Sequence, residues 1–92
     1  TTAFQLFEKS CNGEDPLGCT GLATMYIQGK GTKKNLRKSF ELLEKTCRQE
    51  DALGCYGLSQ SYFYGAGVKK DIEKANYLAQ KACKLGHDSA CN

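Results

Sequence analysis

Residues 53–67 read LGCYGLSQSYFYGAG, and residues 17–31, 36 positions earlier, read LGCTGLATMYIQGKG. When residues 11–46 are aligned with residues 47–82 without a gap, 16 of the 36 positions are identical. A fixed period of roughly 20–50 residues is typical of solenoid proteins, in which each copy forms one unit that stacks on the next. The sequence therefore predicts a repeat protein.

Capping residues and glycines predict where the helices begin and end. Apolar residues recur at helical spacing within residues 2–11, which predicts a first helix. Asp15 followed by Pro16 is a start signal, because the aspartate can cap a helix whose first residue is proline. This second helix is expected to run to about Gln28 and to end at the glycines that follow. Further capping residues predict four later helix starts, at Asn35, Asp51, Asp71 and Asp88.

The six cysteines form three pairs, each with a spacing of eight residues: Cys11 and Cys19, Cys47 and Cys55, Cys83 and Cys91. Each pair places one cysteine near the end of a helix and the other near the start of the next, so we predict one disulfide within each pair. A zinc site is less favoured, because the pairs lie a whole repeat apart and His87 is the only histidine. Free structural thiols remain an alternative. Disulfides persist in oxidising compartments, which predicts a secreted or periplasmic protein.

The predicted fold is all-α: a right-handed superhelix of antiparallel helix pairs, an α–α solenoid, with one disulfide in each 36-residue repeat. We expect one repeat domain over residues 1–92. Its expected parts are a helix of a truncated repeat (1–10), two repeats (11–46 and 47–82) and the start of a further repeat (83–92). Both ends fall inside the helical pattern, so we expect the chain to be part of a longer repeat array.

The charge pattern argues against nucleic-acid binding, and the lengths of the apolar runs argue against a membrane span. The net charge is +3, and acidic and basic residues are interspersed along the chain. This favours an ordinary solvated surface over nucleic-acid binding. No apolar run approaches the length of a membrane span, so we predict no membrane-spanning segment.

A longer motif points to a known family. The pattern Gly-Cys-x-x-Leu-[small]-x-x-Tyr-x-x-Gly-x-Gly-x-x-Lys-[Asn/Asp] occurs at residues 18–35 and again at 54–71. It resembles the Sel-one-like repeat, a relative of the tetratricopeptide repeat. The cysteine spacing resembles its disulfide-bridged subgroup, the Helicobacter-type cysteine-rich proteins. This resemblance implies a role as an adaptor or secreted factor that binds other proteins. Some cysteine-rich members of the family are described as binding or slowly hydrolysing β-lactams.

The sequence contains no recognisable catalytic constellation. The serine β-lactamase motifs Ser-x-x-Lys, Ser-Asp-Asn and Lys-Thr-Gly are all missing. A single histidine builds neither a metal cluster nor a Ser-His-Asp triad, and His87 is expected to be exposed in a connecting turn. We therefore predict no catalytic residue, metal or cofactor. The preferred function is protein or peptide binding, and the alternative is a β-lactam-binding protein or β-lactamase.

The candidate binding surface is a stripe beside the core face of the helix that starts at Asp51. We expect Leu58 and Tyr62 to be nearly buried, and the stripe to be partly exposed on the concave side of the solenoid. The stripe consists of Tyr56, Gln60, Phe63 and Tyr64, with Thr20, Thr24, Ile27 and Gln28 as the equivalents in the preceding repeat. Aromatic side chains beside polar groups are typical of a peptide-binding groove. The alternative is that Phe63 and Tyr64 pack against the next repeat.

Overall fold

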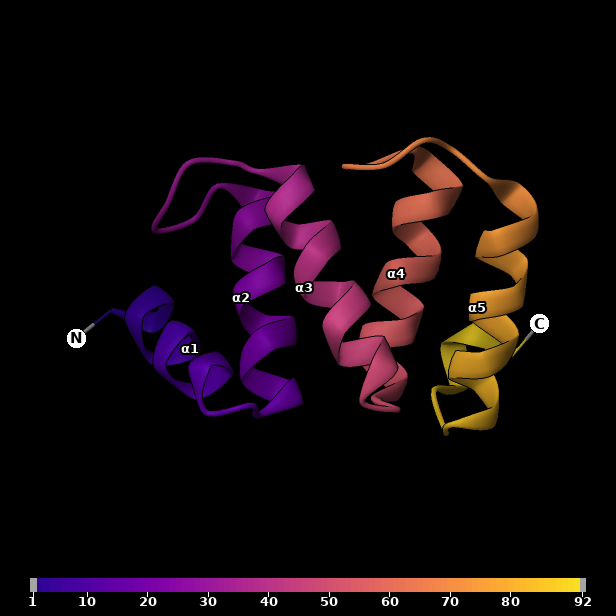
Figure 1. The fold of residues 1–92 in the computed structure, drawn as a ribbon, viewed down its shortest axis with the longest axis horizontal. Coiled ribbons are helices and arrows are strands. Elements are labelled where there is room, and N and C mark those ends of the chain that lie inside the picture. Colours follow the sequence, from indigo (N-terminus) through magenta and orange to yellow (C-terminus); the bar gives the residue numbers. More distant parts are fainter. Residues whose placement is uncertain (1, 92) are drawn as a thin grey trace.

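The computed structural model describes residues 2–91 as an elongated stack of helices, 38 × 24 × 18 Å in extent (Figure 1). Within this range the α-helices are α1 (Ala3–Asn12), α2 (Pro16–Gln28), α3 (Leu36–Arg48), α4 (Ala52–Tyr64) and α5 (Ile72–Lys84). Each helix packs on the next one in the chain, and no strand occurs in residues 2–91. The predicted all-α solenoid is confirmed.

The predicted capping residues begin the α-helices. The side chains of Asp15, Asn35, Asp51 and Asp71 each accept a hydrogen bond from a backbone N–H in the first turn that follows. In place of a sixth α-helix at Asp88, the structure has a short 3-10 helix, η1 (Asp88–Ala90). This turn has no side-chain cap, and the residue after it, Cys91, is bonded to Cys83 of α5.

The main core is built by residues of α2, α3, α4 and α5. It is formed by eight buried residues: Ala23, Phe40, Leu43, Cys47, Cys55, Leu58, Leu78 and Ala82. Two aromatic pairs stack edge to face at equivalent places, Phe4 on Tyr26 at 5.6 Å and Phe40 on Tyr62 at 5.5 Å between ring centroids. Leu58 is buried as expected, but Tyr62 is only half-buried, whereas its equivalent Tyr26 is buried. A lysine ammonium lies near each of these rings, Lys38 at 5.9 Å from the Tyr26 centroid and Lys74 at 5.3 Å from the Tyr62 centroid.

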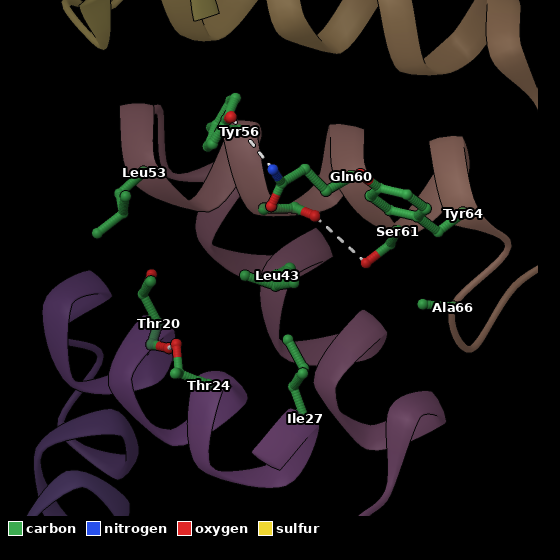
Figure 2. A pocket seen from close by; sticks show the side chains of 11 residues that line it. Thr20, Thr24, Ile27, Leu43, Leu53, Tyr56, Gln60, Ser61, Tyr64 and Ala66 are labelled. Atoms are coloured by element: carbon green, nitrogen blue, oxygen red, sulfur yellow. Dashed lines mark hydrogen bonds between the residues drawn. The ribbon is translucent and has the colours of Figure 1, made fainter. Parts of the chain in front are cut away.

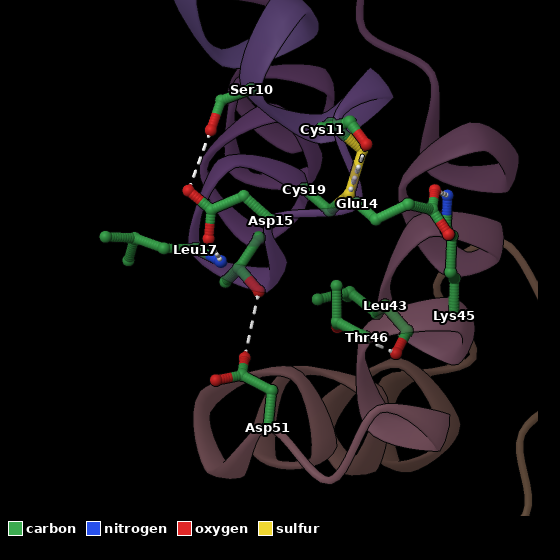
Figure 3. The surroundings of a disulfide bond; sticks show 11 residues. Ser10, Cys11, Glu14, Asp15, Leu17, Cys19, Leu43, Lys45, Thr46 and Asp51 are labelled. Carbon is green, nitrogen blue, oxygen red and sulfur yellow. Dashed lines mark hydrogen bonds and ion pairs between the residues drawn. A yellow bond between two sulfur atoms is a disulfide. The ribbon is translucent and has the colours of Figure 1, made fainter.

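Three disulfides connect successive helices, Cys11–Cys19, Cys47–Cys55 and Cys83–Cys91, which is the predicted pairing. The first of them joins the end of α1 to the start of α2 (Figure 3). Cys19 and Cys55 are fully buried, whereas Cys91 is exposed. The first two bonds are therefore part of the packed interior, and the third is accessible at the surface.

One buried hydroxyl gives a prediction about stability. Ser39 is 1% exposed, and its hydroxyl has no hydrogen-bond partner among residues 2–91. The equivalent residue of the next repeat is Ala75, which is also buried. Because a buried unpaired hydroxyl is unfavourable, we expect Ser39→Ala to raise the free energy of unfolding by about 1 kcal/mol in urea titrations.

The second repeat supplies the control for this substitution. Ser59 Oγ donates a hydrogen bond to the Ala75 carbonyl at 2.7 Å, so Ser59→Ala should lower the free energy of unfolding by about 1 kcal/mol. A loss of stability in Ser39→Ala as large as that in Ser59→Ala would contradict the prediction.

Candidate binding groove

A groove of about 350 Å³ lies between α2 and α4, the first helices of two successive repeats (Figure 2). Leu43, which reaches up from α3, forms its floor, and Ala66 from the loop after α4 closes one end. The remaining lining residues are Thr20, Thr24, Ile27, Leu53, Tyr56, Gly57, Gln60, Ser61 and Tyr64. The groove is therefore built by two repeats together.

Six of the eight predicted binding residues line this groove: Thr20, Thr24, Ile27, Tyr56, Gln60 and Tyr64. Gln28 and Phe63 do not. Each first helix has two edges, and the edge of α2 that turns towards α4 carries Ile27. Phe63 is the counterpart of Ile27 and lies on the edge of α4 turned towards the following repeat. Helix geometry thus places Phe63 on a different edge of α4 from Tyr64, although the sequence pattern put both residues in one stripe.

The aromatic side chains at the end of α4 are not buried against α5. Phe63 is 47% exposed and Tyr64 is 72% exposed, and their rings lie edge to face at 5.0 Å. Both rings are therefore accessible within residues 2–91, and their packing against a following repeat stays an alternative prediction. His87 was expected to be exposed but is half-buried, because its ring stacks on Tyr56 with the centroids 4.4 Å apart.

Several polar groups of the groove are used within the chain. Thr20 is only 6% exposed, and its hydroxyl donates across the repeat boundary to Asp51 Oδ2 at 3.2 Å. Figure 3 shows Asp51 on the far side of this boundary. The Thr24 hydroxyl donates to the Thr20 carbonyl at 3.0 Å, and Gln60 Nε2 donates to the Tyr56 hydroxyl at 3.1 Å. The groove therefore offers mainly apolar surface, together with one amide and two phenol groups.

The prediction missed five lining residues: Leu43, Leu53, Gly57, Ser61 and Ala66. Leu53 and Gly57 belong to the repeated Leu-Gly-Cys-x-Gly-Leu run, which was the available signal. A Cβ atom on Gly57 would stand 2.8 Å from Leu43 Cδ2, so a larger residue there would displace Leu43. The glycine at this position lets a core leucine form the groove floor.

Residues 2–91 contain neither a cluster of metal-binding side chains nor a helix suited to span a membrane. No group of three or more His, Cys, Asp or Glu side chains in residues 2–91 is arranged to hold an ion. In the same part of the chain, no helix has the length and apolar character needed to cross a membrane.

The family assignment follows from comparison with known proteins. The model of the Sel1 repeat matches residues 1–15, 16–51 and 52–87. The chain belongs to the Sel1 repeat family. The resemblance inferred from the Gly-Cys motif is confirmed, and each complete Sel1 unit matched has the 36-residue period found in the sequence.

Solved structures of Sel1 repeat proteins share this fold. Helicobacter pylori cysteine-rich protein B (HcpB) is 38% identical with a TM-score of 0.89, over 96% of this chain and 66% of HcpB. A Sel1 repeat protein from Oxalobacter formigenes is 28% identical with a TM-score of 0.89, over 95% of this chain and 36% of that protein. The protective antigen c5321 of uropathogenic Escherichia coli is 26% identical with a TM-score of 0.91, over 97% of this chain and 19% of c5321.

A curated relative matches over a shorter segment. "Putative beta-lactamase HcpC" from Helicobacter pylori strain J99 is 45% identical over 38 residues. This segment is 41% of the present chain and 13% of HcpC. The Sel1 repeat chain thus aligns with a small part of HcpC and with 66% of HcpB.

Proposed function

We propose that this Sel1 repeat chain binds a peptide segment of a partner protein in the groove between α2 and α4. The observation that carries the proposal is the composition of the lining. Ile27 and Leu53 supply exposed apolar surface above the buried Leu43, and Tyr56, Gln60 and Tyr64 supply aromatic rings and polar groups beside it. Side chains of these kinds are typical anchors of protein interfaces.

The dimensions of the groove suit a short extended peptide. Its lining runs along α4 from Leu53 to Tyr64, which is about 16 Å at the rise of an α-helix. An extended peptide covers the same length with about five residues. Tyr64 is largely exposed, so its ring is free to pack on such a ligand. The proposed ligand is therefore a linear segment with at least one apolar side chain directed towards Leu43.

A peptide-display selection tests the proposal. We expect random short peptides to be enriched on the wild-type chain and to lose at least about tenfold in affinity on Ile27→Asp, because this change puts a charge into the apolar lining. Ile27 is 41% exposed, so the variant is expected to fold, which circular dichroism checks.

The matched control is Leu6→Asp. Leu6 is 57% exposed on α1 and does not line the groove, so the same change of residue type there should leave peptide affinity unchanged. Enriched peptides that lose affinity equally on both variants would show that binding occurs elsewhere.

The β-lactamase alternative has a different kind of support, the name of HcpC. The groove lining contains no lysine, histidine, aspartate or glutamate to serve as a general base. We therefore expect disulfide-intact, metal-free protein to hydrolyse nitrocefin no faster than buffer does. Hydrolysis that survives repurification and is lost in Ile27→Asp would favour the alternative.

We also propose that the full protein is secreted or periplasmic and contains further Sel1 repeats. Three disulfides in so short a chain fit an oxidising compartment. The Sel1 relatives with solved structures extend well beyond the segment that this chain matches. Fractionation of cells that express the full-length protein tests the first part of this proposal.

A further inference from the structure

Five lysines lie in the two loops that connect the helices within each repeat: Lys30, Lys33, Lys34, Lys69 and Lys70. All five are exposed. Asp71 is the only carboxylate in these loops (residues 29–35 and 65–71), and it caps α5. The two loops lie on the same side of the solenoid, at the upper edge in Figure 1. We call this set of five residues the lysine edge.

The lysine edge is continuous with one end of the groove. Ala66, in the second loop, lines the groove, and Ile27 lies close to the start of the first loop. Gly67 packs so closely on the first residue of α3, Leu36, that a Cβ atom would overlap the Leu36 carbonyl. This contact places the second loop beside the helix that follows the first loop. The second loop therefore borders one end of the groove, and the first loop begins beside that end but extends towards Phe4 of α1.

At the opposite edge Lys45 and Lys81 have acidic partners, whereas Lys9 and Lys84 form no ion pair within residues 2–91. Lys45 Nζ lies 2.6 Å from Glu14 Oε2, and at the equivalent position Lys81 Nζ lies 3.0 Å from Glu50 Oε2. Figure 3 shows the side chains of Glu14 and Lys45. Among residues 2–91, none of the five lysines of the lysine edge forms an ion pair. Among the described residues, unpaired lysines are therefore more numerous at the lysine edge, beside one end of the groove, than at the opposite edge.

We propose that the ligand of the groove is a peptide segment in which an apolar or aromatic side chain is followed or preceded by acidic residues. This inference rests on the proposed function. The apolar side chain packs on Ile27 and Leu43, and the carboxylates lie near the lysine edge. Complementary charges at an interface increase the association rate and select the orientation of the partner. The unpaired lysines thus select acidic residues in the bound segment and place them at the lysine edge.

A nucleic acid fits this distribution of charge less well. Nucleic-acid grooves place lysine or arginine along the whole backbone track, because each phosphate carries a charge. Here the lining between Leu53 and Tyr64 has no cationic side chain, and the lysines lie beyond its end. The ligand therefore needs a neutral, apolar part and a separate anionic part, which a peptide provides.

The test uses a library of random short peptides displayed on phage and selected on the disulfide-intact chain. We expect enriched peptides to combine an apolar residue with Asp and Glu. Their affinity should fall about fivefold on the double variant Lys33→Gln/Lys69→Gln, the size expected from two exposed charge pairs. It should also fall as salt is raised. The matched control is Lys9→Gln/Lys84→Gln, which removes the same charge at the opposite edge and should leave affinity unchanged.

The outcomes separate this inference from the proposed function. Enriched peptides that depend on Ile27 but are neutral or basic would overturn the inference and leave the peptide groove intact. A selection that yields no Ile27-dependent peptide would overturn both. A single-stranded oligonucleotide or anionic phosphatidylglycerol vesicles that displace the acidic peptides, and that also bind Ile27→Asp, would overturn the inference in favour of a general polyanion surface.

Discussion

Reduction of the three disulfides is expected to unfold most of the chain at room temperature. Each bond joins cysteines eight residues apart, and closing a loop of that length stabilises the folded state by about 2.5 kcal/mol in the chain-entropy model. Three such contributions are comparable to the whole stability of a small domain, about 5–15 kcal/mol. Far-UV circular dichroism with and without reductant measures the effect as the loss of the thermal transition.

The burial of the three disulfides predicts which of them contributes most to the stability of the fold. Replacing Cys47 and Cys55 by serine should be more harmful than replacing Cys83 and Cys91, because Cys55 is fully buried in the main core and Cys91 is exposed. Limited reduction followed by alkylation and peptide mapping should label the Cys83–Cys91 pair first. A reduced chain that melts at the same temperature as the oxidised one would contradict the expected role of the disulfides.

Gly67→Ala is expected to lower the free energy of unfolding by about 3 kcal/mol. Gly67 has a φ of +78°, where any other L-residue is strained, and an added Cβ would overlap the backbone carbonyl of Leu36. A backbone atom inside a helix start cannot move as freely as a side chain can. The loop after α4 must then separate from α3, and urea titration measures the loss.

The preceding repeat provides a control with the same strain and without the backbone overlap. Gly31 has a φ of +75°, and an added Cβ would approach only the Phe4 side chain, at 3.1 Å. We expect Gly31→Ala to cost about 1 kcal/mol, the strain of the left-handed conformation. Equal losses in the two variants would show that the close approach of Gly67 to α3 contributes nothing.

The helical fold could be predicted because its signals are local and occur twice. Asp15 and Asp51 cap equivalent helices, and the glycines after Gln28 and Tyr64 end them. The repeat also limits the possible disulfides, because the two cysteines of each pair, such as Cys47 and Cys55, lie on either side of one short turn. At Asp88 the prediction of an α-helix was wrong, and the short η1, which has no side-chain cap, formed instead.

The groove was predicted less completely because it belongs to two repeats. A stripe on one helix identifies Gln60 and Tyr64, but it cannot show that Leu43 rises between α2 and α4 to form the floor. Nor does it show that Thr20 is buried by its hydrogen bond to Asp51 of the next repeat. Such contacts depend on the distance between neighbouring repeats.

The sequence by itself determined the repeat, the starts of α2 to α5, the disulfide pairs and the likeness to Sel1 repeats, because each of these depends on local patterns or on their recurrence along the chain. Only the tertiary structure decided which helix edges face each other, and hence that Ile27 lines the groove while Phe63 does not. It also decided that the two lysine-containing loops lie on the same edge, whereas Lys45 and Lys81 form ion pairs with Glu14 and Glu50. The physical reason is that stacking sets the angle and spacing between repeats through packing contacts, which no local pattern contains.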